Sequence, residues 1–204
     1  MIHRIPKFVQ KLLSDYFEFS IPTDKKIIYL TFDDGPVPEV TPKVLDLLDR
    51  YDAKATFFCV GDNIRKHREC FERIILRGHA TGNHTTHHLK GIISGTKHYL
   101  SDTEQSREFH HGNLFRPPYG RLKGKQIRGL QRKGYRLILW SVISYDYNQK
   151  ISPRRCFKNV SKLRCGDIVL FHDSIKAEKN MLYSLERVLK LYSEKGFRFM
   201  AIEQ

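Results

Sequence analysis

Short apolar, β-branched and aromatic runs recur along the chain, and most are separated by longer stretches with helical periodicity. Seven such runs predict strands, at 27–32, 55–60, 79–83, 113–116, 136–142, 168–171 and 196–202. The stretches between them predict helices at 41–51, 62–77, 94–111, 122–133, 153–164 and 178–195. Because strand and helix alternate, we expect a parallel sheet that is closed, or nearly closed, into an α/β barrel.

Residues 1–24 precede the first predicted strand and are expected to form an N-terminal arm or an amphipathic helix. Apolar residues recur at helical spacing at Ile2, Ile5, Val9, Leu12, Leu13, Tyr16 and Phe17, beside Arg4, Lys7 and Lys11. One interpretation is a basic helix on a membrane surface. Packing on the barrel is preferred, because Pro6 interrupts the pattern. No apolar run has the length of a signal-peptide core, so a cytoplasmic location is expected, with peripheral membrane association as the alternative.

Composition describes an ordinary globular chain of one domain. The 204 residues are 40% hydrophobic and 28% charged, which argues against disorder. A net charge of +14 favours anionic surfaces such as nucleic acid, acidic glycans or phospholipid head groups. The basic residues are scattered and no nucleic-acid motif accompanies them, so a solvated basic surface is preferred and no specific nucleic-acid binding is expected. A monomer is expected.

The four cysteines have no CxxC spacing, so a thiolate zinc site is unsupported. Cys59 lies in an apolar run and is predicted to be a buried structural thiol. Whether Cys156 and Cys165 pair is left open by the sequence.

Five short polar clusters each follow an apolar run, where the carboxyl ends of parallel barrel strands gather reactive groups. They are Thr31-Phe32-Asp33-Asp34-Gly35-Pro36, His84-Thr85-Thr86-His87-His88, Arg116-Pro117-Pro118-Tyr119-Gly120, the segment 140–147, and Leu170-Phe171-His172-Asp173. Together they contain adjacent carboxylates, helix-spaced imidazoles, an arginine and a late histidine. These are the parts of a metal-dependent hydrolase.

The first cluster offers two carboxylates at a turn. Adjacent residues leaving a strand point to opposite sides, so one of Asp33 and Asp34 can bind metal while the other faces substrate. Gly35-Pro36 then forces a turn at the barrel mouth. A solvated turn without chemistry is the alternative.

The second cluster offers a histidine pair. His84 and His88 are one helical turn apart, so their imidazoles can converge on one cation, and His87 offers a competing pair with spacing three. An exposed histidine cluster without a ligand is the alternative. With one carboxylate of the first cluster, the set becomes Asp plus two His, which leaves an open coordination position as in catalytic metal sites.

The third and fifth clusters offer an arginine and a histidine. Consecutive prolines after Arg116 stiffen the chain and can hold the Tyr119 main-chain N–H toward the cavity. The arginine can orient and ionise a neighbouring carboxylate, and a rigid surface turn is the alternative. His172 ends a predicted strand, where it can shuttle a proton near neutral pH or be simply structural.

In these clusters, from Thr31 to Asp173, the sequence resembles the polysaccharide deacetylases, carbohydrate esterase family four. The resemblance implies a distorted (β/α)7-type barrel in a single domain, with the deacetylase-like barrel at 25–204. It implies hydrolysis of acetyl groups, usually N-acetyl, from sugars. It also implies Asp34, His84 and His88 as ligands of a divalent metal, usually Zn²⁺, with Co²⁺ or other divalent ions as substitutes.

The resemblance further implies residue roles. Asp33 resembles the catalytic base, which takes a proton from the attacking water. His172 resembles the acid that protonates the departing amine, and the metal and the Tyr119 amide would hold the oxyanion. Arg116 resembles the residue that positions Asp33, and Leu170 resembles the apolar wall of the acetate pocket.

The fourth cluster departs from the family. Ile143 and Tyr147 stand where related sequences commonly have an Asp and a second Trp. Asp146 remains and is the expected partner of His172. Tyr147 and Trp140 are the expected sugar contacts.

The expected partner is an acetylated glycan, and peptidoglycan, chitin oligomers, poly-N-acetylglucosamine, lipopolysaccharide sugars and acetylated xylan all remain open. An O-acetyl carbohydrate esterase or other amidase on the same metal site, and a non-catalytic basic glycan-binding protein, are the alternatives. The N-deacetylase is preferred, because every expected catalytic residue type is present.

Overall fold

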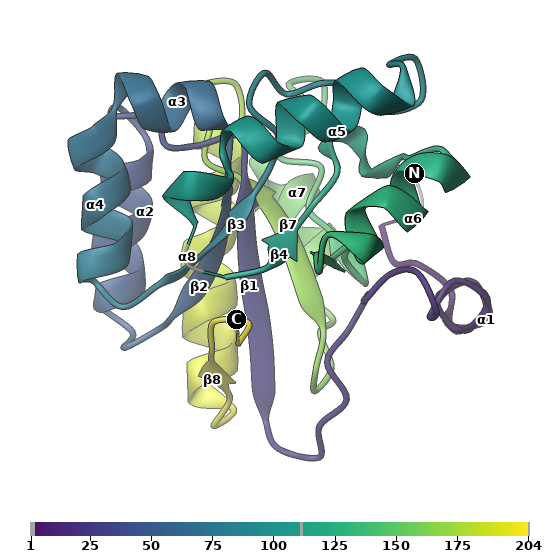
Figure 1. Ribbon diagram of the computed structural model, residues 1–204. Helices are drawn as coiled ribbons and strands as arrows, with labels where there is room; N and C mark the ends of the chain where they lie inside the picture. Colours follow the sequence, from purple (N-terminus) through teal and green to yellow (C-terminus); the bar gives the residue numbers. More distant parts are fainter. Residues whose placement is uncertain (1–2, 111, 204) are drawn as a thin grey trace.

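A parallel sheet forms the centre of the computed structural model, which describes residues 3–110 and 112–203 (Figure 1). Its strand order is β5-β4-β3-β2-β1-β7-β6, and β8 pairs with β1. The strands are β1 (Ile27–Asp33), β2 (Ala55–Cys59), β3 (Ala80–Asn83), β4 (Leu114–Phe115), β5 (Arg136–Leu137), β6 (Val142–Ile143), β7 (Ile168–His172) and β8 (Arg198–Phe199). Because β5 and β6 end the order on opposite sides, the barrel is a half-barrel, which confirms the predicted distorted, single-domain α/β barrel.

Helices follow most strands, as the alternating pattern predicts. They are α1 (Lys7–Leu12), α2 (Thr41–Asp49), α3 (Gly61–Lys66), α4 (Arg68–Leu76), α5 (Thr96–Gln105), α6 (Gly124–Arg132), α7 (Pro153–Val160) and α8 (Glu178–Glu194), with 3-10 turns η1 (Arg107–Phe109) and η2 (Pro118–Gly120). None of these helices combines the length and the apolar character needed to cross a bilayer, within the described residues.

The alternation of side chains along strand β1 places polar groups inside the barrel. Ile28, Leu30 and Phe32 belong to the core that α2 and α8 cover. The alternate residues therefore face the barrel interior, because side chains of a strand alternate between its two faces. Thr31 and Asp33 reach the buried guanidinium of Arg116 from this face. The period of the strand thus places the last carboxylate of β1 inside the site.

The N-terminal arm lies along the open side of the half-barrel. Isolated β-bridges join Glu18 to Ile138, Arg4 to Val142 and Ser20 to Asp167. Arg4 also forms an ion pair of 2.8 Å with Asp167. These contacts cover strand edges that would otherwise be left without partners.

Three predicted elements differ in the structure. The predicted strand 136–142 is divided into β5 and β6, because the carbonyls of Ile138 and Leu139 accept hydrogen bonds from Arg116 instead of continuing one ladder. The predicted helix 62–77 is divided at His67 (φ −131°, ψ 51°) into α3 and α4. The predicted helix 94–111 is shorter and becomes α5 followed by η1, and His111 lies outside the described residues.

The cysteines form no disulfide. All four thiols are free, and Cys59 is buried as predicted. Cys156 is buried and Cys165 is exposed, so the pairing that the sequence left open does not occur.

Candidate active site and metal centre

A pocket of about 190 Å³ lies at the carboxyl ends of the strands, where the five polar clusters meet. Its lining consists of Asp33, Asp34, His84, His88, Tyr119, Gly120, Trp140, Ile143, Tyr147, Leu170, His172 and Lys176. Nine of the eleven predicted site residues are in this lining. The other two, Arg116 and Asp146, are fully buried and bind residues of the pocket directly.

The candidate metal ligands converge as a group. One donor atom each from Asp34, His84 and His88 lies within 4.8 Å of the others. The Nε2 atoms of His88 and His84 are 3.2 and 3.9 Å from Asp34 Oδ1. His84 Nδ1 is bound to the Arg116 carbonyl at 2.7 Å, which leaves its Nε2 as the atom directed at the cluster. This donor set fits a divalent cation such as Zn²⁺ with an open coordination position.

Burial also suits His84 to bind a cation. It lowers the pKa of the ring to about 4, so the imidazole is neutral at pH 7. A neutral ring keeps a lone pair on the nitrogen that faces the cluster. For Asp34, burial works against ionisation, but the His88 hydrogen bond and the nearby histidines hold its pKa below the usual range. The carboxylate is therefore ionised in neutral solution.

His84 and His88 converge as predicted, but the prediction that they lie one turn apart on a helix is wrong. Residues 84–90 are a loop after β3, and Thr85 (φ 64°) and His88 (φ 53°) have left-handed backbones. The Thr85 N–H donates to Asn83 Oδ1 at 2.8 Å, and the Thr86 N–H donates to Asp102 Oδ1 at 3.0 Å. The Asn83 bond shapes the loop locally, as Asx-type bonds do in turns, and the Asp102 bond ties the loop to α5.

The competing ligand His87 is held outside the cluster. Its Nδ1 is hydrogen-bonded to Asp102 Oδ2, and its Nε2 lies 3.8 Å from Asp62 Oδ2. The buried Asp102 thus fixes the ring away from Asp34. The structure selects His88 over His87, a choice that spacing alone left open.

The candidate base Asp33 is held by the most buried cation in the site. Arg116 has no exposed surface and donates from Nη1 to Asp33 Oδ1 at 2.8 Å. Its other donors bind Thr31 Oγ1 and the carbonyls of residues 138 and 139, at 2.7 to 3.1 Å. The guanidinium also lies 4.1 Å from the Phe58 ring centroid. These five contacts fix the guanidinium, which in turn orients the Asp33 carboxylate through one hydrogen bond.

The expectation that Asp33 and Asp34 point to opposite sides is wrong, because both line the same pocket. The cause is the backbone of Asp34, whose φ of 81° turns the chain out of strand geometry. Asn63 donates to the Asp34 carbonyl at 2.7 Å, which holds this turn. Two carboxylates therefore face one cavity.

Asp173 is a residue whose role the sequence did not suggest. It accepts hydrogen bonds from the Gly35 N–H at 3.0 Å and from Thr41 Oγ1 at 2.6 Å, and so anchors the loop after β1. A Cβ on Gly35 would lie 2.0 Å from Asp173 Oδ2. The only sequence signal was the position of Asp173 beside His172.

The candidate acid His172 has the predicted partner. Its Nδ1 is 2.8 Å from Asp146 Oδ1, and its main-chain N–H donates to Asp146 Oδ2 at 2.8 Å. Burial lowers the pKa of His172, but the Asp146 carboxylate outweighs this effect and raises the pKa to about 9. The ring is therefore a proton donor at neutral pH. The Tyr147 ring packs edge-on against it, with centroids 4.9 Å apart.

Apolar and aromatic side chains form the remaining walls. Leu170 is 2% exposed and lines the pocket. Tyr119 is 59% exposed and its ring centroid lies 5.0 Å from that of His88. Trp140 packs so closely on Gly120 that an added Cβ would approach the indole to 2.7 Å. The tryptophan therefore supports the turn that carries Tyr119.

The fold and the site together define a class: an α/β half-barrel with a candidate mononuclear metal centre between a buried Arg–Asp pair and a partly buried His–Asp pair. The sequence model of the polysaccharide deacetylase family matches residues 20–138. The chain belongs to this family, which confirms the resemblance seen in the motifs.

Three relatives illustrate the similarity. A peptidoglycan-N-acetylglucosamine deacetylase of Bacillus cereus is 32% identical over 196 residues, which cover 93% of this chain and 92% of the relative. The crystal structure of the Bc1960 peptidoglycan N-acetylglucosamine deacetylase, in complex with an N-oxidanyl-benzamide, superposes with a TM-score of 0.85 at 28% identity and covers 94% of both chains. BA3943 of Bacillus anthracis, described as a CE4 family pseudoenzyme, has a TM-score of 0.80 at 21% identity and covers 91% of this chain and 67% of its own. That last likeness concerns the fold alone.

Proposed function

We propose that this protein is a metal-dependent N-deacetylase that removes acetyl groups from the N-acetylated sugars of a glycan, with peptidoglycan as the favoured class. The observation that carries the proposal is the convergence of three units on one pocket: the Asp34, His84 and His88 cluster, the Arg116–Asp33 pair and the Asp146–His172 pair. The names of the relatives support peptidoglycan as the substrate.

The proposed metal site is Asp34, His84 and His88, with Zn²⁺ as the preferred ion. When bound there, such a cation supplies Lewis-acid polarisation of the acetyl carbonyl and lowers the pKa of water. Asp33 accepts the proton of the attacking water, since the hydrogen bond from Arg116 orients its carboxylate. The main-chain N–H of Tyr119 donates to the developing oxyanion.

His172 completes the reaction by donating its proton to the departing amine nitrogen. An amine is a poor leaving group unless it is protonated, and Asp146 keeps the imidazolium available. Leu170 offers the apolar wall against the acetyl methyl group, and Trp140 and Tyr147 offer surface to the sugar. The chain therefore has every residue type that this chemistry needs. We expect a non-catalytic glycan-binding protein to lack some of them.

The experiment that tests this function measures acetate release from peptidoglycan fragments and N-acetylglucosamine oligomers. Zinc-loaded protein is compared with its Asp33→Asn variant, in which the carboxylate that accepts the proton is lost and the three ligands remain. We expect release by the wild type and a loss of about a hundred-fold or more in the variant, at equal zinc content. Equal rates for the two proteins would refute the role of Asp33, and no release from any fragment would refute the function.

A further inference from the structure

A second hollow continues the active site outward. It measures about 370 Å³ and shares Asp34, His88, Tyr119 and Lys176 with the acetyl pocket. Its other lining residues are Val60, Asp62, Asn63, Lys66 and His87. The acetyl pocket therefore opens into a groove that has room for the part of a glycan next to the acetylated sugar.

Two lysines line this groove, and a third lies beside it against the Tyr119 ring. Lys90, in the loop after β3, places Nζ 5.6 Å from the Tyr119 ring centroid. Lys176, after β7, places Nζ 5.9 Å from the Tyr147 ring centroid, and Lys66 at the end of α3 lines the hollow. All three are exposed, and within the described residues none has a carboxylate in ion-pair distance. Aromatic faces hold two of these ammonium groups beside the opening.

The carboxylates of the groove are already engaged. Asp62 lies 3.4 Å from Arg65 and 3.8 Å from His87, and Asp34 belongs to the candidate metal cluster. The free charges at the groove are therefore positive. A cation at the cluster would add to the same field.

We propose that this groove binds an anionic group, a carboxylate or a phosphate, that the glycan carries next to the acetylated sugar. The inference rests on the proposed function. Lysine ammonium groups are mobile point charges that suit an anion whose position varies between substrates. The lysines also attract an anionic substrate from solution, because unpaired charges of one sign at the mouth of a cleft strengthen the electrostatic potential there. Recognition of this kind would favour acidic glycans over neutral N-acetylglucosamine oligomers.

The test compares peptidoglycan fragments with the same fragments after their carboxylates are converted to neutral amides. A phosphorylated N-acetylglucosamine oligomer is the third substrate. We expect kcat/KM to be higher for the acidic fragment than for its amide. Lys90→Gln and Lys176→Gln should each lower the ratio of these two kcat/KM values, acid over amide, by about two- to five-fold. Lys179→Gln, an exposed lysine of α8 outside the groove, is the matched control and should leave the ratio unchanged. A higher kcat/KM for the phosphorylated oligomer than for the acidic fragment would identify phosphate as the recognised group.

Equal kcat/KM for acid and amide, or a ratio that the Lys90/Lys176 double variant leaves unchanged, would overturn the inference while the deacetylase function stands. Calorimetric binding of both fragments decides the case in which no acetate is released. In that case, the wild type should bind the acidic fragment more tightly than the amide, and the double variant should lose this difference. Such a result supports anion binding at the groove even though the proposed reaction has failed. Equal binding of acid and amide overturns the inference.

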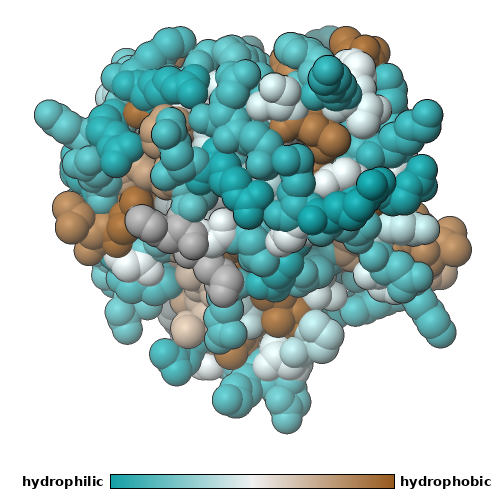
Figure 2. All heavy atoms as spheres, in the orientation of Figure 1, coloured by the Kyte–Doolittle hydropathy of each residue, from teal (hydrophilic) through white to brown (hydrophobic). Residues whose placement is uncertain are grey.

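A separate observation concerns the N-terminal arm. Phe8, Leu12 and Tyr16 are 73%, 76% and 46% exposed, and their spacing of four places them in one strip on α1 and the turn after it. Ile5 and Leu13 of the same arm pack against the barrel. In Figure 1, α1 projects from the right edge of the molecule, and Figure 2 shows hydrophobic spheres at that edge.

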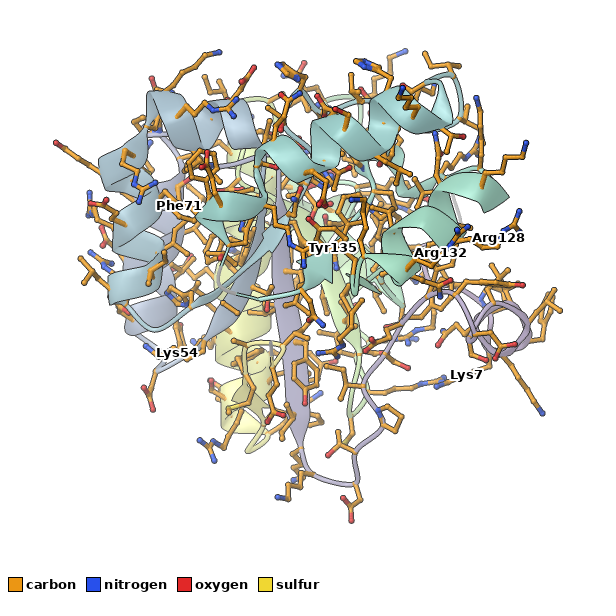
Figure 3. All side chains as sticks on the ribbon, viewed as in Figure 1. Lys7, Lys54, Phe71, Arg128, Arg132 and Tyr135 are labelled. Carbon is orange, nitrogen blue, oxygen red and sulfur yellow. The ribbon has the colours of Figure 1, made fainter. Side chains whose placement is uncertain are left out.

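Basic side chains flank this strip. Lys7 and Lys11 directly precede Phe8 and Leu12, both are exposed, and Figure 3 shows Lys7 at the same edge as α1. Within the described residues neither has a carboxylate partner. We infer that this strip docks on the surface of an anionic lipid bilayer, since exposed aromatic and aliphatic side chains beside lysines bind where anionic head groups meet acyl chains. The charge of the strip argues against a second copy of the chain, which would bring like charges together.

Co-sedimentation with vesicles tests this inference. We expect binding to vesicles of phosphatidylcholine with phosphatidylglycerol and not to phosphatidylcholine alone. Phe8→Ser and Leu12→Ser should each weaken binding by about ten-fold, and Lys7→Gln with Lys11→Gln should remove the preference for anionic lipid. Leu76→Ser is the matched control, because Leu76 is 84% exposed at the end of α4.

Absent binding to the anionic vesicles, or an equal loss in Leu76→Ser, would overturn the membrane inference. Dimerisation in lipid-free ultracentrifugation that Phe8→Ser abolishes would overturn it in favour of a second copy. Near-ultraviolet circular dichroism of each variant confirms that the barrel is intact.

Discussion

Replacing Arg116 by methionine breaks the buried ion pair behind the active site and is expected to destabilise the fold strongly. Methionine removes the donors that Asp33, Thr31 and the carbonyls of Ile138 and Leu139 use. Asp33 is only 4% exposed, so its carboxylate would remain buried without its closest cation. Removing one partner of a buried pair costs about 3–5 kcal/mol. For a domain of this size, that corresponds to a fall in Tm of about 6–20 °C.

Urea denaturation with a calorimetric scan measures this loss, and an exposed ion pair supplies the comparison. Arg68 and Glu72 lie 2.9 Å apart on α4 with side chains 56% and 52% exposed, so Arg68→Met should cost only about 0.5 kcal/mol. Arg116→Lys keeps the charge, loses the fork of donors and should fall between these values. It remains informative if Arg116→Met fails to fold.

A double-mutant cycle identifies the source of the loss. The cycle combines Arg116→Met with Asp33→Asn, which removes the buried charge. We expect a coupling free energy of about 1 kcal/mol or more, because the two side chains are in direct contact. A loss below about 1 kcal/mol in Arg116→Met, or a cycle without coupling, would refute the argument that the buried pair holds Asp33.

Three further predictions concern the metal, the acid and the loop after β1. His84→Ala and His88→Ala should each lose tightly bound zinc in elemental analysis, since each removes one donor of the cluster, and unchanged zinc in both would contradict the assignment. Asp146→Asn should move the alkaline limb of the kcat–pH profile to lower pH. His172 must be protonated to act as the acid, and the protonated form is lost as the pH rises through its pKa of about 9. Because the Asp146 carboxylate raises this pKa, its removal should lower the pKa and move the limb. An unmoved limb would show that another group titrates there. Gly35→Ala should lower Tm and activity together because its Cβ would lie 2.0 Å from Asp173 Oδ2, whereas Gly95→Ala, with no atom within 4 Å, should do neither.

Much of the architecture was predictable from local pattern. The run that became β1 is recognisable by its β-branched and aromatic residues, and its period of two predicts which residues face the core. The polar clusters follow strands, so their meeting at one end of a parallel sheet follows from topology. The motif pairs Asp146 with His172, and the two side chains lie 2.8 Å apart.

Other features depend on contacts between residues far apart in the chain. The division of the run 136–142 into β5 and β6 follows from the guanidinium of Arg116, which binds carbonyls that an isolated pattern assigns to a strand. The Asp33–Arg116 bond joins residues 83 positions apart, and the Gly35–Asp173 bond joins residues 138 apart. Periodicity describes neighbours one to four positions away, so it contains no information about such partners.

The sequence by itself determined the class of fold, the family and the set of chemical groups at the site, because these depend on residue identity, order and local period. The tertiary structure alone decided that His88 rather than His87 joins the cluster, because the buried Asp102 holds His87 elsewhere. It alone turned Asp34 into the same pocket as Asp33 through a left-handed backbone. Both outcomes are set by hydrogen bonds between a loop and a helix, from His87 to Asp102 of α5 and from Asn63 of α3 to the Asp34 carbonyl, and these form only once the half-barrel has brought loop and helix together.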